Sequence, residues 1–286
     1  MILSAHRAST TERFLAVYGI GFGVLLTLLG PLGPGLLVVG ANLLVAAVVL
    51  TFLPRLRAAR SNGIASLGQM LPLLGFYLFY RECAVVLNQP GVPWHDLLVQ
   101  TADRALVGPG PHSAAAMGEW FAFGYMSYVP VLILAGLIQA RRAGSPAGVE
   151  DVVQPICIAW GACYVVFVLF PVLGPRLADP AFQVGRIGAG PFTSLAVANQ
   201  QYGMLRGAAF PSAHIAATVI ALFIVRRSLL FWLLLPIGLS IPVAAFYLGY
   251  HYLTDIIAGV VMAIAVLAFQ HWSHASQVTT DPGASW

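Results

Sequence analysis

The sequence predicts an all-α protein, a polytopic bundle of transmembrane helices, and three observations lead to this fold class. Of its 286 residues, 59% are hydrophobic and only 8% are charged, far below the roughly 25% charged residues of an ordinary soluble domain. The mean hydropathy is +0.85. Apolar runs close to the ~20 residues that cross a bilayer recur along the whole chain, which indicates a bundle of spanning helices rather than a soluble domain with one anchor.

Eight apolar segments are candidate spanning helices, at residues 14–30, 35–53, 63–80, 116–140, 151–172, 211–226, 229–249 and 253–270. Gln69 interrupts the third segment and Glu119 the fourth. The first segment follows Arg7 and Arg13 and can be read as a signal peptide, but no small-residue cleavage site follows it cleanly, which favours a retained helix. We expect an N-terminal transmembrane hairpin at residues 1–60, a six-helix core at 61–271 and a loosely ordered cytoplasmic tail at 272–286.

The arginines indicate how the bundle is oriented. In an eight-helix topology one side of the membrane holds Arg7, Arg13, Arg55, Arg57, Arg60, Arg141, Arg142, Arg226 and Arg227. By the positive-inside rule this side is cytoplasmic and contains both termini. The membrane is expected to be a plasma or inner membrane, and the longer loops near 81–115 and 173–210 are expected on its extracytoplasmic side.

Other classes of function are disfavoured by the charge and the cysteines. The net charge of +4 comes from arginine alone, since the chain has no lysine, and so few charges make no nucleic-acid patch. The expected partner is the lipid bilayer. The three cysteines, Cys83, Cys157 and Cys163, are an odd number, and two of them share one predicted helix. A disulfide framework or a Cys-x-x-Cys metal site is therefore not supported.

Three ionisable residues are expected to meet on the outer face. His214 lies at the outer start of the sixth predicted helix, His251 at the junction of the seventh and eighth, and Arg176 at the outer end of the fifth. Ionisable side chains at membrane depth are costly and are candidates for a functional site. Taken singly, each of the outer arginines can equally be a headgroup anchor, and each histidine an interfacial residue bonded to backbone.

The spacing around His251 points to imidazole chemistry. Asp255 follows four residues later, and on a helix these positions lie on one face about 6 Å apart. A carboxylate there can accept the proton of one ring nitrogen and leave the other as an oriented nucleophile or base. The alternative is a simple helix-start pair, because an aspartate in the first turn favours the helix dipole.

The stretch AAFPSAHIAA at 208–217 supplies a complementary anion site. Pro211 suits the first turn of a helix, so the backbone N–H groups of Ser212 and Ala213 are expected to be unpaired and to favour an anion. His214 emerges from the same turn and can donate a proton to a departing alkoxide. Arg176 can clamp phosphate oxygens as a bidentate donor.

These residues resemble the type 2 phosphatidic acid phosphatase superfamily of membrane lipid phosphatases and phosphotransferases, over roughly residues 100 to 270. Its Pro-Ser-Gly-His motif is matched at 211–214 with alanine for glycine, and its Ser-Arg-x5-His-x3-Asp motif by His251 and Asp255. The resemblance implies a six-helix phosphatase-type core. It also implies that His251 forms a phosphohistidine, that Asp255 orients it and that His214 protonates the leaving group.

The departures from the family pattern lie in its phosphate-binding cations. The family's Lys-x6-Arg-Pro motif keeps only Arg176, because Leu169 replaces the lysine and Leu177 the proline. The third-motif arginine falls at Ala245 and its serine at Ala244. These changes, with the stretch DRALVGPGP containing Asp103, Gly108 and Pro111, resemble the inositol phosphorylceramide synthase branch. Arg206 and Arg186 are our candidates for the missing charge.

The sequence therefore predicts a membrane enzyme that breaks a lipid phosphoester at the extracytoplasmic face. Water as the acceptor makes it a phosphatase, and a lipid or sugar hydroxyl makes it a phosphotransferase. No cofactor and no metal is expected, because amides, arginine and imidazolium supply the electrostatic stabilisation. Two alternatives remain open: a proton-coupled transporter using His214, His251 and Asp255, and an inactive lipid-binding family member.

Overall fold

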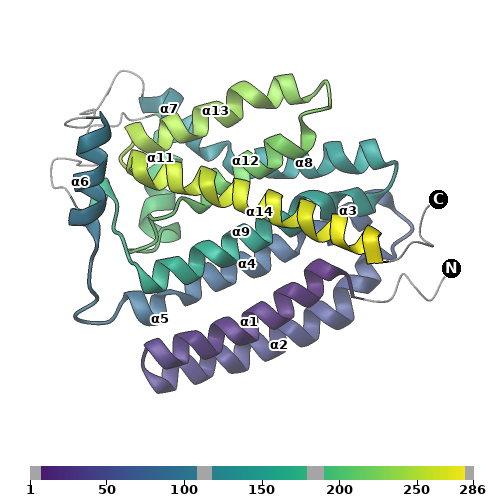
Figure 1. Ribbon diagram of the computed structural model, residues 1–286, viewed down its shortest axis with the longest axis horizontal. Coiled ribbons are helices and arrows are strands. Elements are labelled where there is room, and N and C mark those ends of the chain that lie inside the picture. The colour runs from purple at the N-terminus through teal and green to yellow at the C-terminus, as the bar shows by residue number, and fades with distance from the viewer. Residues whose placement is uncertain (1–7, 108–117, 179–189, 281–286) are drawn as a thin grey trace.

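The computed structural model describes residues 8–107, 118–178 and 190–280, with side chains up to residue 273. Over these residues the chain is helical, without β-strands; one isolated parallel bridge joins Val172 and Ala208. Figure 1 shows the long helices lying side by side as one bundle. The prediction of an all-α polytopic bundle is confirmed.

An N-terminal helical hairpin forms one edge of the bundle (Figure 1). It consists of α1 (Thr10–Leu29) and α2 (Leu32–Arg57). Ser9 and Glu12 form a capping box that satisfies backbone N–H groups at the start of α1. The Glu12 carboxylate also accepts a hydrogen bond from the Arg57 guanidinium at 2.7 Å. This ion pair joins the start of α1 to the end of α2.

The second quarter of the chain is more broken than the sequence indicates. The third predicted span consists of α3 (Asn62–Met70), α4 (Pro72–Glu82) and α5 (Ala84–Leu87). The region predicted as an outer loop contains α6 (Asp96–Val107). The fourth predicted span is bent by 41° between α7 (Gly118–Met126) and α8 (Tyr128–Ala143).

The second half of the chain completes the bundle. Its elements are a short 3₁₀ turn at Pro146–Val149, α9 (Glu150–Leu169), α10 (Pro175–Ala178), α11 (Pro191–Ala198), a π-turn at Asn199–Gly203, α12 (Ala213–Val225), α13 (Phe231–Tyr247) and α14 (Leu253–Thr280). Two boundaries correct the sequence predictions. The N-cap of α12 is Ser212, so Pro211 lies before the helix instead of in its first turn. Helix α14 continues to Thr280, past the predicted end at 270 and into the expected tail.

Several of these helices fit a membrane. Within the described residues, five stretches are long and apolar enough to span it: Thr10–Leu29, Leu32–Arg57, Asn62–Leu87, Pro146–Leu169 and Leu253–Ser273. The bent pair α7 and α8 makes a sixth if it counts as one span, and α12 and α13 are shorter apolar helices. The chain is thus an integral membrane protein.

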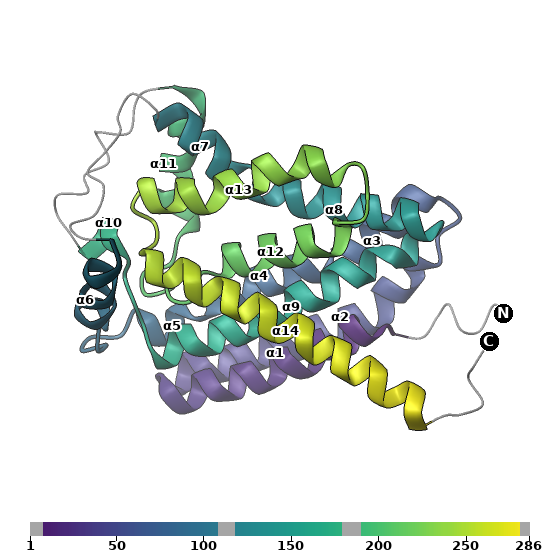
Figure 2. The same cartoon turned by 45° about the horizontal axis from the view of Figure 1, so that its top comes forward.

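Helix α9 is the centre of the packing. It contacts α1, α4, α8, α12 and α14, and Ile156, Cys157 and Cys163 on it are fully buried. The ends of the bundle differ. The start of α1 and the end of α14 lie at one end, whereas α6, α10 and the start of α14 lie at the other (Figures 1 and 2). The second end carries the polar groups considered next.

Candidate active site

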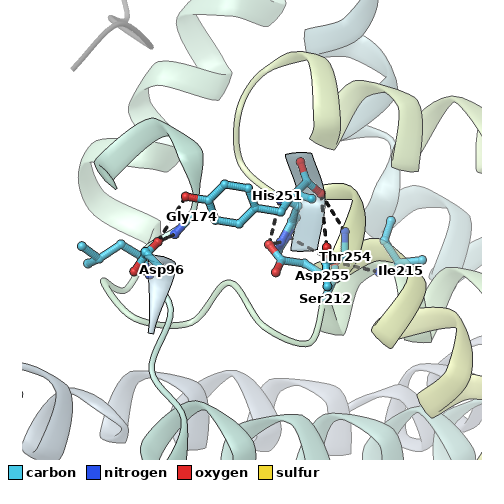
Figure 3. Close-up of polar contacts among 10 residues, drawn as sticks. Asp96, Gly174, Ser212, Ile215, His251, Thr254 and Asp255 are labelled. Atoms are coloured by element: carbon cyan, nitrogen blue, oxygen red, sulfur yellow. Dashed lines mark hydrogen bonds and ion pairs between the residues drawn. The ribbon is translucent and has the colours of Figure 1, made fainter. Parts of the chain in front are cut away.

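Two loops and the start of α12 meet at this end of the bundle (Figure 3). The loop after α9 pairs with the loop before α12, since the Ala209 N–H donates to the Val172 carbonyl at 3.0 Å. Gly174 has φ +85°, and a Cβ there would lie 2.8 Å from the Tyr250 carbonyl oxygen. Glycine therefore permits the loop that carries Arg176 to lie directly against the loop that carries His251.

Arg176 is buried with one edge of its guanidinium unused. Its Nη1 donates to the Leu248 carbonyl at 3.0 Å, and its backbone N–H donates to the Gly249 carbonyl at 2.8 Å. Its Cζ lies 5.2 Å from the Tyr250 ring centroid. Its Nε and Nη2 have no hydrogen-bond partner among the described residues. These two nitrogens form the side-on fork that suits a carboxylate or phosphate.

The start of α12 is fixed against α14. Ser212 is the N-cap, and its hydroxyl accepts the Ile215 N–H. The Ser212 N–H donates to the Asp255 carbonyl at 3.0 Å. A Cβ at Gly259 would lie 2.6 Å from the Ser212 carbonyl oxygen, so glycine allows this close approach. The expected unpaired N–H at Ser212 is therefore wrong, whereas the Ala213 N–H has no partner among the described residues.

His251 has a polar neighbour on each side of its ring. Its Nε2 lies 3.1 Å from the Ser212 hydroxyl, and its Nδ1 lies 3.4 Å from Asp255 Oδ2. The same carboxylate oxygen accepts the Tyr252 N–H at 2.8 Å. Asp255 is fully buried and His251 nearly so. The structure thus brings together the three residues Ser212, His251 and Asp255, as Figure 3 shows.

Burial sets the charge of His251. It lowers the pKa of His251 from 6.5 to about 4, while a backbone hydrogen bond at Ala209 opposes the shift. The imidazole is therefore neutral near pH 7, and its contact with Asp255 is not an ion pair between two charges. A neutral ring with its proton on Nδ1 leaves a lone pair on Nε2, facing the Ser212 hydroxyl.

His214 faces His251 across the site. Their ring centroids are 6.0 Å apart, so the two imidazoles border the same site. On its other sides the His214 ring contacts Tyr128, with centroids 4.6 Å apart, and Tyr125, at 5.5 Å. Two aromatic walls thus orient the side chain in the first turn of α12.

Helix α6 holds the loop after α9 and the start of α14 through two carboxylates, and Figure 3 shows one of them, Asp96, beside Gly174. Asp96 accepts the N–H groups of Leu173 and Gly174 at 2.9 and 3.0 Å. Asp103 accepts the Thr254 N–H at 3.0 Å. Sequence reasoning named Asp103 only within a family-like stretch and missed Asp96. Their i, i+7 spacing on one amphipathic helix face was the available signal.

The other predicted cations lie apart from these contacts. Arg206 is exposed, and its Cζ lies 5.9 Å from the Trp94 ring centroid. Its predicted role in binding phosphate stays a prediction. Arg186, Gly108 and Pro111 lie outside the described residues.

The positions of the family's missing cations have distinct surroundings. Ala244 and Ala245 are fully buried in an apolar cluster with Phe121 and Tyr125, so this structure has no room there for an arginine. Leu169, at the end of α9, is 57% exposed, and Leu177 is also exposed.

Among the described residues, no group of three His, Cys, Asp or Glu side chains could hold a metal ion.

Fold and site together define a helical membrane protein with a buried histidine–aspartate pair, a second histidine and an arginine whose Nε and Nη2 have no partner in the described part of the chain. Residues 105–269 match the model of the PAP2 superfamily, which is more than half of the chain. The chain belongs to this superfamily, whose members are generally phosphatases, and it has a lipid phosphatase-type function.

Comparisons with curated proteins and with solved structures give no match. The matched region contains α7 to α13, the start of α14 and every histidine contact described above. The hairpin α1–α2 and the helices α3 to α5 precede it.

Proposed function

We propose that this protein cleaves a lipid phosphoester through a phosphohistidine formed on His251. The observation that carries the proposal is the pair of contacts on the His251 ring, to Ser212 at 3.1 Å and to Asp255 at 3.4 Å. Together they favour a neutral imidazole whose Nε2 lone pair is directed into the site. An oriented, unprotonated nitrogen is what nucleophilic catalysis requires of histidine.

In the first step, His251 Nε2 bonds to phosphorus as the bond from phosphorus to the lipid oxygen breaks. The electron pair stays on the lipid oxygen, which takes a proton from the imidazolium form of His214 and leaves that ring neutral. In the second step, an acceptor hydroxyl gives its proton to His214 and attacks phosphorus. The phosphorus–nitrogen bond then breaks and the electron pair returns to His251.

The phosphate oxygens need stabilisation as charge builds up on them. The free Nε and Nη2 of Arg176 can hold two of these oxygens. The Ala213 N–H at the start of α12, unpaired within the described ranges, adds a fixed dipole. Both donors belong to the protein itself, so the proposed step needs no metal ion.

The charge count favours a donor with one negative charge. A phosphate monoester is close to a dianion near neutral pH, whereas a diester carries a single charge. Arg176 is the one motif cation retained, since Leu169 and Ala245 replace the others. This supports a diester donor and transfer to an alcohol, as in the inositol phosphorylceramide synthase branch. Hydrolysis of a monoester is the second candidate.

We further propose that the site faces the extracytoplasmic side and that both termini are cytoplasmic. The paired arginines end α2 and α8 or follow α12, and these ends lie opposite the site (Figure 1). The three native cysteines are buried. A cysteine introduced at Asn88, exposed at the end of α5, should therefore react with an impermeant maleimide from outside intact cells, and one at Ala143, exposed at the end of α8, should not.

The experiment that tests the function uses protein purified in detergent. Phosphatidic acid, an isoprenyl diphosphate and a phospholipid diester are offered as donors, with and without a lipid alcohol as acceptor. We expect turnover that disappears in His251→Ala, either as released phosphate or as a headgroup moved to the alcohol. Turnover that survives in His251→Ala contradicts the proposal. Retained lipid binding with no turnover in the wild type supports the inactive family member instead.

A further inference from the structure

An apolar cavity of about 250 Å³ leads from the side of the bundle to His214. Its inner end is formed by His214 and Ala213 on α12. Its outer rim is formed by Leu74 on α4 and by Val129 and Ile133 on α8. These three rim residues are exposed on the surface of the bundle, along segments that are apolar enough to lie in a membrane. The cavity therefore opens toward the hydrocarbon core of the bilayer.

The cavity wall is aromatic for most of its depth. Five tyrosines and a tryptophan line it: Tyr77, Tyr80, Tyr125, Tyr128, Tyr164 and Trp160. Two of their polar ends are engaged in hydrogen bonds to backbone. The Tyr80 hydroxyl accepts the Leu205 N–H at 2.7 Å, and the Trp160 indole donates to the Ala213 carbonyl at 3.2 Å. Flat rings with occupied polar ends present an apolar surface to an occupant.

The N-terminal part of the chain forms one side of this cavity. Leu74, Tyr77 and Tyr80 belong to α4, which precedes the matched region at 105–269. Through its hydroxyl, Tyr80 also holds the segment that leads to the Ser212 cap. Helix α4 thus contributes both to the cavity and to the position of the loop before His214.

We propose that this cavity binds one hydrocarbon chain of the lipid substrate, and that α4 thereby helps to select the substrate. The proposal rests on the function proposed above, because it takes His214 as the group beside the reacting ester. His214 lines the cavity, whereas His251 and Arg176 do not. The chain therefore belongs to the oxygen that His214 protonates. The lipid alcohol is the leaving group, and the phosphoryl group, with any headgroup that it carries, stays bonded to His251.

Binding is tested first without turnover. The probe is phosphatidic acid with a diazirine at the end of one acyl chain, photolysed with His251→Ala protein in detergent, and the adducts are mapped by mass spectrometry. We expect adducts on the cavity walls of α4 and α8. Val129→Trp, which fills the rim, should reduce them about tenfold. Leu134→Trp, at an exposed position of the same helix outside the cavity, should leave them unchanged.

The matched pair on α4 separates this cavity from its neighbour. Leu74 lines both this cavity and a second apolar hollow against the α1–α2 hairpin, whereas Leu78 lines only the hollow. Leu74→Trp should reduce the adducts and Leu78→Trp should not. Equal adduct yields in Val129→Trp and Leu134→Trp, or adducts confined to the hollow, would overturn the proposal.

Kinetics with active protein then separates the two proposals. Excluding about two methylene groups from the cavity, at about 0.8 kcal/mol each, should raise the KM for a long-chain donor about tenfold. The same Val129→Trp variant should leave kcat/KM within about twofold for a water-soluble short-chain donor with the same headgroup. An equal loss on both donors contradicts the role of the cavity while leaving His251-dependent turnover intact. If the wild type shows no turnover but the adducts are specific, the proposed phosphohistidine mechanism is wrong and the cavity still binds the hydrocarbon chain.

Discussion

Nε2 of His251 lies 3.1 Å from the hydroxyl oxygen of Ser212, the residue that caps α12. One hydroxyl thus joins a helix N-terminus to the ring that we propose as the nucleophile. Because the hydroxyl also accepts the Ile215 N–H, its own proton is free to point at Nε2. An arriving phosphate oxygen can take over this proton and release the Nε2 lone pair for attack.

Replacing Ser212 should affect stability and turnover to different degrees. Ser212→Ala removes the cap, which costs about 0.5–2 kcal/mol of stability, and also the donor to His251. We expect a lower thermal midpoint and a fall in kcat of about tenfold or more. Ser212→Thr keeps a hydroxyl and should recover most of both. Full turnover in Ser212→Ala would show that the hydroxyl has no part in orienting the ring.

Asp255→Asn tests the orientation of the imidazole. The amide keeps the volume but loses the carboxylate oxygen that faces Nδ1 at 3.4 Å. The ring can then place its proton on Nε2, where it blocks attack on phosphorus. By analogy with other carboxylate–histidine pairs, kcat should fall about 10²–10⁴-fold. Near wild-type kcat, measured in protein with an unchanged thermal midpoint, would argue against this role.

Arg176→Lys tests the bidentate fork. Lysine keeps the charge but cannot reproduce the paired Nε and Nη2 donors. Charge-assisted hydrogen bonds are worth about 1.5–3 kcal/mol each, so kcat/KM should fall about 10- to 100-fold. Arg141→Lys is the matched control, since that arginine is exposed in the last turn of α8, at the other end of the bundle. The proposed clamp fails if both variants lose activity equally.

The lowered pKa of His251 makes a prediction about acid. The unfolded chain has a histidine pKa near 6.5, and the folded chain one of about 4, so between these values the unfolded state binds more protons. The contribution of His251 to stability is therefore complete above about pH 6.5 and is lost as the pH falls toward 4. The free energy of unfolding, measured between pH 7 and 4, should lose this slope in His251→Gln. Turnover should fall toward pH 4, as the nucleophile gains its proton.

The carboxylates of α6 should act as positioning residues. Asp96→Asn weakens the hold on the Leu173 and Gly174 N–H groups and so loosens the loop that carries Arg176. We expect a higher KM, with faster hydrogen exchange at the Gly174 amide. Asp103→Asn should instead affect the start of α14 at Thr254. If KM rises in Asp96→Asn while hydrogen exchange at the Gly174 amide is unchanged, Asp96 does not act by holding this loop.

The sequence was sufficient for the elements with strong local signals. Apolar length predicted eight spans; among the described residues five stretches are long enough to span, the bent pair makes a sixth, and α12 and α13 are shorter than predicted. The predicted helix order placed His214, His251 and Arg176 at one end of the bundle, where the structure has them. It failed where the partner is distant in sequence. Nothing near Ser212 indicates that its N–H bonds to the Asp255 carbonyl.

Helix α6 shows a similar limit. Its amphipathic pattern lies in a region read as an outer loop, and the targets of its two aspartates are backbone N–H groups. Backbone groups leave no residue signature, so only the tertiary structure identifies them as partners.

The most direct measurement is capture of the phosphoenzyme. Protein is mixed with a donor labelled with ³²P at its phosphorus and quenched in alkali, where phosphohistidine persists, and the labelled peptide is sequenced. We expect label on the peptide containing His251, lost on acid treatment and absent from His251→Ala, while His214→Ala still accumulates it from a donor with a good leaving group. Turnover by the wild type with no labelled His251, or label on another residue, would contradict this expectation.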